Sequence, residues 1–292
     1  MTSGDHVKDP TPFIQHGHNL ETRLESLTGF LTPNDLFFVR SSGPTPRLAL
    51  DPYRLRVEGD AIERPLELTY EELLRLPRRT LIAYLDCAGN WRRFFQLLMG
   101  KPAPGTQWGT GGIGCAEWTG TSLARVLELA GVRADAVDVN LIGLDDASFS
   151  RPLPIAKALD ENTLLAYRMN GETLPPDHGF PLRAVVPGWI GCNSIKWLGR
   201  IIVSSRKVWV TNNTSDYVLI GPEWPRRDHS PAEGAPLTTQ SIKSALALPW
   251  PASLAPGRQR LRGIAASPHG TISLVQWNVD AAAEWQPALL SS

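Results

Sequence analysis

Cysteine is scarce in this chain of 292 residues, which has only Cys87, Cys115 and Cys192. An odd and low cysteine count does not build a disulfide framework, and it is typical of proteins from a reducing compartment. No C-x-x-C pair or cluster of histidines provides the ligand spacing of a structural zinc site. Cys115 and Cys192 are therefore expected to be core residues rather than zinc ligands.

Charge imbalance and long apolar runs are absent as well. The chain has 29 basic and 29 acidic residues, so its net charge gives no reason to expect nucleic acid or a membrane surface as a partner. No apolar run approaches the roughly 18 residues that span a bilayer. The first residues, Met1–His6, lack the basic and apolar regions of a signal peptide. The sequence therefore predicts a cytoplasmic protein in which basic residues act locally.

Short strands and short helices alternate along the chain. Arg54–Glu58 and residues 137–141 have the period-two pattern of half-buried strands, and further strands are expected over 80–85, 195–203 and 208–210. Thr69 and Glu72 form a capping box before a helix that Pro77 ends. Leu123, Val126, Leu127 and Ala130 have helical spacing before Gly131. This mixture, rich in proline and glycine, favours an α+β fold over a doubly wound sheet.

Two segments place reactive side chains beside glycines. In the first, the apolar strand Thr80–Leu85 leads to Cys87, which Ala88, Gly89 and Asn90 follow. In the second, the sequence HGFPLR of residues 178–183 continues through apolar residues to Ser194, Lys196 and Trp197. A thiolate is a ligand for a soft metal, and the cationic side chains suit a phosphate. Together they suggest a metal cofactor that carries phosphate.

These segments, with Thr32–Arg40, resemble the sulfite oxidase family of molybdenum enzymes in order and spacing over roughly residues 30–235. The resemblance implies a sulfite oxidase-type fold that binds the molybdenum–molybdopterin cofactor, with Cys87 as the metal ligand. It implies that Arg40 and Tyr217 act on the substrate in catalysis. The residues that it implies for cofactor binding are Phe38, Arg40, Ser42, Asp145, His178, Arg183, Ser194 and Lys196.

Each of these residues also has a structural interpretation. Cys87 could be a small buried hydrophobe, Arg40 a solvated loop residue, and Tyr217 a partly buried tyrosine. Arg183 is harder to explain in this way, because it interrupts an apolar run and a buried charge needs a partner. His178 and Asp145 could belong to turns, and Lys196 could be a charge at a strand edge.

The chain departs from the family pattern at two places near the expected site. Ser41 and Ser42 replace the usual Asn and His, and Trp91 stands where the family often has a basic residue. A hydroxyl can donate a hydrogen bond but carries no positive charge. A third feature, G-x-G-x-x-G at 109–114, has no strand before it and no helix directly after it. It therefore lacks the context of a dinucleotide-binding loop.

We expect an N-terminal arm over residues 1–30, a molybdopterin-binding domain over 31–235 and a further β segment over 236–292. Strands are expected at 259–265 and 271–279. The family places an immunoglobulin-like dimerisation domain after the molybdenum domain, but a complete sandwich needs about 100 residues. The last segment is therefore expected to be a partial, truncated version of that domain, which leaves a homodimer open.

The resemblance implies that the chain oxidises a small oxyanion, sulfite, to sulfate by oxo transfer. No His-Pro-Gly-Gly haem motif is present, so the electrons are expected to pass to an external acceptor such as a cytochrome or oxygen. The altered residues at 41, 42 and 91 leave open a sulfoxide or nitrate reductase that uses the same cofactor. The short C-terminal segment leaves open a cofactor-binding or interaction protein without turnover.

Overall fold

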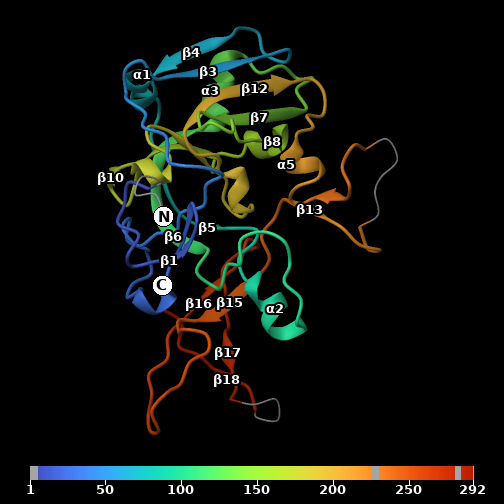
Figure 1. The fold of residues 1–292 in the computed structure, drawn as a ribbon. Helices are drawn as coiled ribbons and strands as arrows, with labels where there is room; N and C mark the ends of the chain where they lie inside the picture. Colours follow the sequence, from blue (N-terminus) through green and yellow to red (C-terminus); the bar gives the residue numbers. More distant parts are fainter. Residues whose placement is uncertain (1–5, 225–229, 280–283, 292) are drawn as a thin grey trace.

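The computed structural model describes residues 6–224, 230–279 and 284–291. Two five-stranded sheets form the main body (Figure 1). The first sheet is antiparallel, and β6 and β9 form its centre. Its strands are β5 Arg79–Asp86, β6 Ile113–Ser122, β9 Leu164–Met169, β10 Glu172–Thr173 and β11 Arg183–Val185.

The second sheet is mixed and has the order β4-β3-β12-β7-β8. Strands β3 and β12 are parallel, and the other neighbours are antiparallel. The five strands are β3 Arg54–Gly59, β4 Leu66–Thr69, β7 Asp138–Gly143, β8 Ser150–Pro154 and β12 Leu198–Ser204. Mixed sheets with short helices confirm the α+β class.

The helices are short, and α1 and α3 pack against the core between the two sheets. The α-helices are α1 Tyr70–Arg75, α2 Arg93–Met99, α3 Leu123–Ala130, α4 Ile155–Ala158 and α5 Thr211–Thr214. The 3-10 helices are η1 Leu24–Ser26, η2 Pro176–His178 and η3 Gly191–Asn193. In α1, Glu72 N donates to Thr69 Oγ1 and Thr69 N donates to the Glu72 carboxylate, which confirms the capping box. Among the residues described, no helix is long and apolar enough to cross a membrane.

The first sheet buries a different core on each face. Along β9, Leu165 and Tyr167 face the core shared with the second sheet, α1 and α3. Leu164 and Ala166 face a second core with Phe37, Trp108 and Trp118. This alternation is the ordinary period-two pattern of a strand buried on both faces. Cys87 follows β5 at the edge of the second core.

Four predicted strands differ from the structure. In the tail, only residues 263–265 of the strand expected at 259–265 and Gln276–Trp277 of the one expected at 271–279 are in strands. The strand expected at 195–203 begins only at Leu198, because Trp197 has a left-handed backbone with φ of 51°. Residues 208–210 form no strand. There, Val208 N donates to the Asp138 carboxylate, and the Asn213 side chain bonds Val208 O and Val210 N.

The N-terminal segment is packed into the fold. Strands β1 Ile14–His16 and β2 Asn19–Glu21 form a hairpin, and Leu20 bridges to Val39 before the Arg40 loop. Phe13, Leu20 and Val39 form a small buried cluster. The hairpin therefore touches the loop in which several predicted site residues lie.

The C-terminal segment contains two-stranded hairpins. Its strand pairs are β13 Val218–Leu219 with β14 Ala235–Pro236, β15 Lys243–Leu246 with β16 Gly263–Ala266, and β17 Gln276–Trp277 with β18 Gln286–Pro287. The last two pairs lie at the far end of the molecule from β3 and β4 (Figure 1). They are separate two-stranded units rather than two packed sheets, so an immunoglobulin-like sandwich is not formed in the described part of the tail.

The tail is nevertheless bound to the main body beside Cys87. The buried Gln240 side chain donates from Nε2 to Asp86 O (2.9 Å) and Trp189 O (3.1 Å). Lys243 Nζ pairs with the fully buried Asp86 carboxylate. Gln240 and Lys243 thus both contact Asp86, which directly precedes Cys87, so the C-terminal segment supports the end of β5.

Candidate molybdopterin site

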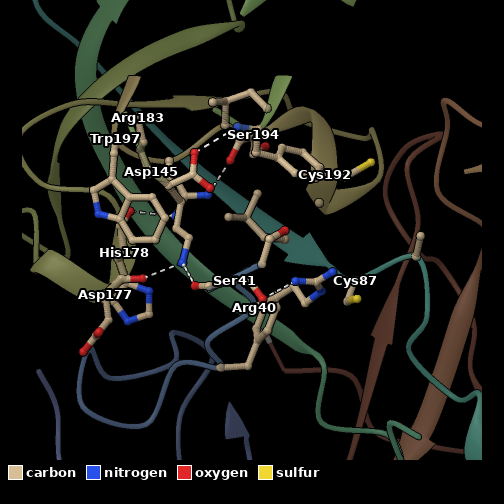
Figure 2. A pocket seen from close by; sticks show the side chains of 18 of the residues that line it. Arg40, Ser41, Cys87, Asp145, Asp177, His178, Arg183, Cys192, Ser194 and Trp197 are labelled. Atoms are coloured by element: carbon tan, nitrogen blue, oxygen red, sulfur yellow. Dashed lines mark hydrogen bonds between the residues drawn. The ribbon is translucent and has the colours of Figure 1, made fainter. Parts of the chain in front are cut away.

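One pocket collects all ten predicted site residues. Its empty space, counted together with its open mouth, is about 770 Å³. Its walls come from the loop after Phe37, the end of β5, the segment 177–197, and single residues from two other loops (Figure 2). The predicted residues in its lining are Phe38, Arg40, Ser42, Cys87, Asp145, His178, Arg183, Ser194, Lys196 and Tyr217.

Cys87 lies in the wall that β5 provides. It is a free cysteine with 8% of its surface exposed. Its N–H donates to Gly112 O (2.9 Å), and its carbonyl accepts from Asn90 N (2.8 Å). Burial raises the pKa of the Cys87 thiol, although the Gly89 N–H and the Arg40 cation oppose this. A soft metal ion would hold the sulfur as the thiolate in spite of that burial.

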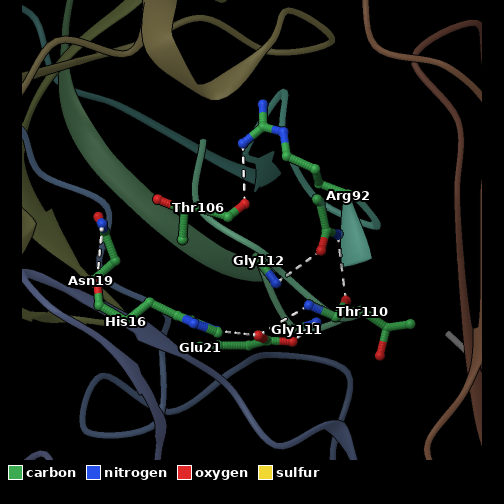
Figure 3. A network of polar contacts seen from close by, with 10 residues as sticks. His16, Asn19, Glu21, Arg92, Thr106, Thr110, Gly111 and Gly112 are labelled. Carbon is green, nitrogen blue, oxygen red and sulfur yellow. Dashed lines mark hydrogen bonds and ion pairs between the residues drawn. The ribbon is translucent and has the colours of Figure 1, made fainter. Parts of the chain in front are cut away.

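The glycine-rich loop at residues 109–114, which precedes and enters β6, binds the carboxylate of Glu21 (Figure 3). Glu21 accepts from Gly109 N and Gly111 N, both at 3.0 Å, and lies 2.7 Å from His16 Nε2. The loop leads into a strand, β6, and two of its amides are used by Glu21. This agrees with the rejection of a dinucleotide-binding loop.

Asn90 joins this loop to the cysteine turn. Its side-chain oxygen accepts from Gly112 N (3.0 Å), and its Nδ2 donates to the Asp86 carboxylate (3.0 Å) and to Thr110 O (3.3 Å). Cys87 is thus fixed from both sides through backbone and amide contacts that do not use its sulfur.

Arg183 and Lys196 form the cationic wall opposite. Arg183, with 4% of its surface exposed, donates to three backbone carbonyls, those of His178, Ser194 and Ala184, at 2.9, 2.9 and 3.2 Å. Its guanidinium lies 4.9 Å from the centre of the Trp118 ring. Burial lowers the pKa of Arg183 to about 9. In the part of the chain that the structure describes, no carboxylate is a hydrogen-bond partner of this cation.

Lys196 is in a similar position. Its Nζ donates to Ser41 Oγ (2.6 Å) and Asp177 O (2.9 Å). Burial and the nearby Arg183 lower the pKa of Lys196 far below its usual value, although the carboxylate of Asp177 opposes this. Two desolvated cations in one wall would both be favoured by a bound anion.

Three further predicted residues of the pocket are fixed by contacts with the protein. Ser194 Oγ accepts from Val186 N (3.1 Å), and Asp145 Oδ1 accepts from Phe149 N (2.9 Å). Phe38 stacks on Phe37 with ring centres 5.3 Å apart. Their side chains therefore have little freedom to reorganise.

Arg40 and Tyr217 line the pocket together with Cys87. The Arg40 guanidinium bonds the carbonyl of Ser41, whose N–H donates to Asn19 Oδ1 (3.0 Å). Burial raises the pKa of Tyr217 to about 12, so its phenol keeps its proton at neutral pH and can donate a hydrogen bond. A guanidinium and a phenol at one pocket could bind an oxyanion.

Other groups in or near the pocket were not among the predicted site residues. Cys192, which was expected to be a core residue, is instead partly exposed and lies in the pocket wall, and Ser41, Asp177 and Trp197 also line the pocket. Asp177 directly precedes His178, so the motif itself was a usable signal for it. Lys8, which contacts His178, is distant in sequence and belongs to no motif. The described residues contain no cluster of three or more His, Cys, Asp or Glu arranged for a metal.

The chain is similar to known molybdopterin-binding oxidoreductases over most of its length. The family model described as "Oxidoreductase molybdopterin binding domain" matches residues 42–210. The mitochondrial sulfite oxidase of Rattus norvegicus is 35% identical over 99% of this chain and 55% of its own length. The NADH nitrate reductase of Ulva prolifera is 38% identical over 61% of this chain and 22% of its own. This chain thus spans about half the length of the sulfite oxidase and less of the nitrate reductase.

A solved structure has the same fold. The sulfane dehydrogenase SoxCD of Paracoccus pantotrophus superposes with a TM-score of 0.80 and 30% sequence identity, covering 94% of this chain and 68% of that one. The expected cytoplasmic location stays a prediction, because the rat relative is a mitochondrial protein by name.

Proposed function

The chain belongs to the oxidoreductase molybdopterin-binding domain family, and on this premise we propose that it is a molybdenum-cofactor enzyme that oxidises sulfite to sulfate. The observation that carries the proposal is the single pocket in which a buried free cysteine faces two desolvated cations. The sulfite oxidase relatives match nearly the whole chain, whereas the nitrate reductase matches 61% of it.

The donor set fits the cofactor. Cys87 offers a soft thiolate for molybdenum. Among the described residues, no carboxylate lies within hydrogen-bond distance of Arg183 or Lys196, so a phosphate group would provide a balancing negative charge. Asp145, Ser194 and His178 would bind the polar edges of the pterin. The bound cofactor would supply the oxygen transfer and accept the two electrons.

The remaining groups of the pocket would bind and orient the substrate. Sulfite gains one oxygen, derived from water, and releases two protons and two electrons as it becomes sulfate. Arg40 would bind the oxyanion through its planar guanidinium. Tyr217, protonated because of its raised pKa, would donate a hydrogen bond without adding charge. Ser42, where the family usually has His, would contribute a neutral hydroxyl.

The electrons would pass to an external acceptor, such as a cytochrome or oxygen. Because this chain spans only about half of its sulfite oxidase relative, the acceptor and the association state are parts of the proposal. The described tail keeps Leu274, Trp277 and Trp285 exposed, so this surface is a candidate for covering by a second copy. We expect a chain that is monomeric or only weakly dimeric, which light scattering over a range of concentrations would test.

A reductase acting on nitrate or a sulfoxide is the second candidate. The Ulva relative favours nitrate as the substrate. The loss of the basic residue at position 42, which leaves a less positive pocket, favours a neutral sulfoxide instead.

One experiment distinguishes these activities. Molybdenum is first measured in the purified protein by elemental analysis. The oxidised protein is then mixed anaerobically with sulfite, and separately the reduced protein with nitrate or dimethyl sulfoxide, while the cofactor absorbance is followed. Rapid reduction by sulfite with formation of sulfate is expected. Oxidation by nitrate or sulfoxide without any response to sulfite would replace the proposal with the reductase. Loaded protein that responds to none of these would indicate a binding protein, and protein without molybdenum would overturn the assignment.

A further inference from the structure

Lys8 reaches His178 from the N-terminal segment. Its Nζ donates to two backbone carbonyls, Asn34 O at 2.7 Å and Phe37 O at 2.9 Å. It also lies 2.7 Å from Nε2 of the His178 ring. This lysine is therefore one of the groups packed against a residue that lines the pocket.

The backbone around Lys8 fixes its position. Val7 N donates to both carboxylate oxygens of Asp177 at 2.9 and 3.1 Å, and Lys8 N donates to the same carboxylate at 2.7 Å. Thr45 Oγ1 also donates to it at 2.5 Å. Residues 7 and 8 are thus attached to the residue directly before His178, and the side chain of Lys8 has a defined anchor.

The contacts of Lys8 determine which ring nitrogen of His178 carries a hydrogen. An ammonium has three hydrogens and cannot accept a hydrogen bond. Two of the hydrogens serve the carbonyls of Asn34 and Phe37, and the third faces Nε2. Nε2 must then be the unprotonated acceptor, and the hydrogen of the neutral ring lies on Nδ1. Tautomers are assigned from such networks.

The charges around the ring keep it neutral. Burial is the main reason why the pKa of His178 lies well below its usual value, and the cations of Lys8, Lys196 and Arg183 lower it further. Asn34 O, 3.3 Å from Nε2, opposes this. Burial lowers the pKa of Lys8 to about 8, with the carboxylates of Asp177 and Asp35 opposing, so Lys8 is mainly an ammonium at pH 7.

We propose that Lys8 is a positioning residue that holds His178 in its neutral Nδ1–H tautomer, so that the ring can donate a hydrogen bond to the ligand of the pocket. Every hydrogen bond given above for the ring uses Nε2, which leaves the N–H at Nδ1 to be offered. The partner would be an acceptor oxygen or nitrogen on the pterin or its phosphate. The inference rests on the proposed function only for the identity of that ligand.

The tautomer can be measured in cofactor-free protein. The chain has six histidines, which are labelled with ¹⁵N, and the His178 signals are identified by their loss in His178→Gln. Two-bond ¹H–¹⁵N correlation spectra at pH 7 should show protonated Nδ1 and bare Nε2 in the wild type. Lys8→Arg, which keeps a cationic donor, should preserve this pattern, whereas Lys8→Met should produce the Nε2–H form or a mixture. Lys101→Met, which removes an exposed lysine, is the matched control and should change nothing.

A second measurement tests the link to the cofactor. Loaded proteins are incubated with a molybdenum chelator, and the rate of metal loss is followed. Lys8→Met should lose the cofactor about tenfold faster than wild type, because one hydrogen bond to a charged or polar ligand contributes about 1.4 kcal/mol. In the His178→Gln background the same substitution should have no further effect. If Lys8→Met does not fold by circular dichroism, Lys8→Gln replaces it.

The results of these two measurements distinguish the proposed role of Lys8 from the proposed function of the protein. An Nε2–H ring in the wild type, or an unchanged tautomer in Lys8→Met, would overturn the role of Lys8 even if the enzyme oxidises sulfite. A changed tautomer with unchanged cofactor loss would show that the Nδ1–H does not bind the cofactor, and would equally overturn the proposal. Wild-type protein that never contains molybdenum would instead refute the proposed function, while the tautomer result would still stand.

Discussion

Replacing Glu21 with alanine should destabilise the loop behind Cys87. In the folded protein the Glu21 carboxylate accepts from two backbone amides, Gly109 N and Gly111 N, and contacts His16. Alanine removes all three acceptor contacts without providing a substitute. The amide of Gly111 is buried, whereas that of Gly109 is only partly buried, so water can replace the lost acceptor at one site more easily than at the other.

The magnitude follows from these burials. An unsatisfied buried donor costs about 1–3 kcal/mol, so the full cost at Gly111 and a reduced cost at Gly109 give about 3 kcal/mol for Glu21→Ala. Glu21→Gln keeps one acceptor oxygen and should cost about half as much. Glu25→Ala, which removes an exposed carboxylate four residues along the chain, should stay within about 0.5 kcal/mol of wild type.

Guanidinium unfolding followed by tryptophan fluorescence measures these free energies, since the chain has ten tryptophans. A second assay reports on the loop itself. Because Gly112 O accepts from Cys87 N, loosening the loop should make the buried thiol of Cys87 react faster with a thiol reagent in the cofactor-free protein. If Glu21→Ala behaved like Glu25→Ala in both assays, the carboxylate would not be what holds this loop.

Four further predictions concern the site and the tail. Cys87→Ser should fold normally but contain little molybdenum by elemental analysis, because a hydroxyl is a hard and poor match for the thiolate position; full metal content would contradict the ligand role. Arg183→Met should reduce cofactor occupancy, measured as metal content. Arg40→Ala should leave occupancy near wild type and raise KM for sulfite about tenfold or more in steady-state kinetics. Loss of metal in Arg40→Ala, with a raised KM but full metal content in Arg183→Met, would exchange the two roles. The pKa of His178 in the folded protein lies well below 6.5 because of burial, so below pH 6.5 the unfolded chain binds one more proton and the free energy of unfolding falls as the pH falls. His178→Gln should reduce this dependence by up to about 1.4 kcal/mol per pH unit in unfolding experiments from pH 6.5 to 5. An unchanged dependence on pH would show that the ring becomes charged in the folded state. Lys243→Met should leave the buried carboxylate of Asp86 without its cation. The free energy of unfolding should fall by about 3 kcal/mol, and proteolysis after residue 236 should become faster. Unchanged proteolysis would show that this ion pair does not hold the tail.

Patterns of short range predicted much of the fold. The capping box at Thr69 and the spacing of apolar residues over 123–130 are local signals, and α1 and α3 formed where they indicated. The ten site residues lie in one pocket because the motifs that carry them lie at strand ends and turns that the two sheets bring together. That placement is geometric, and the roles of these residues stay predictions.

The misses have a common physical cause. Residues 208–210 have the composition of a strand, but the side chains of Asp138 and Asn213 take their backbone groups, a competition that a local pattern cannot show. The late start of β12 depends on the left-handed Trp197. Lys8 belongs to no motif, and its importance arises only from contacts with residues that are distant in the sequence. Tertiary contacts, not local preference, decided each of these cases.

The residues that hold the turn around Cys87 in place come from opposite ends of the chain, so they are synthesised at different times. Glu21 holds the glycine loop and is synthesised early, whereas Gln240 and Lys243 bind the residue before Cys87 and are synthesised late. During synthesis, the turn therefore lacks part of its support until most of the chain has left the ribosome. Because Asp86 directly precedes Cys87, the position of the ligand turn depends on residues near both ends of the chain.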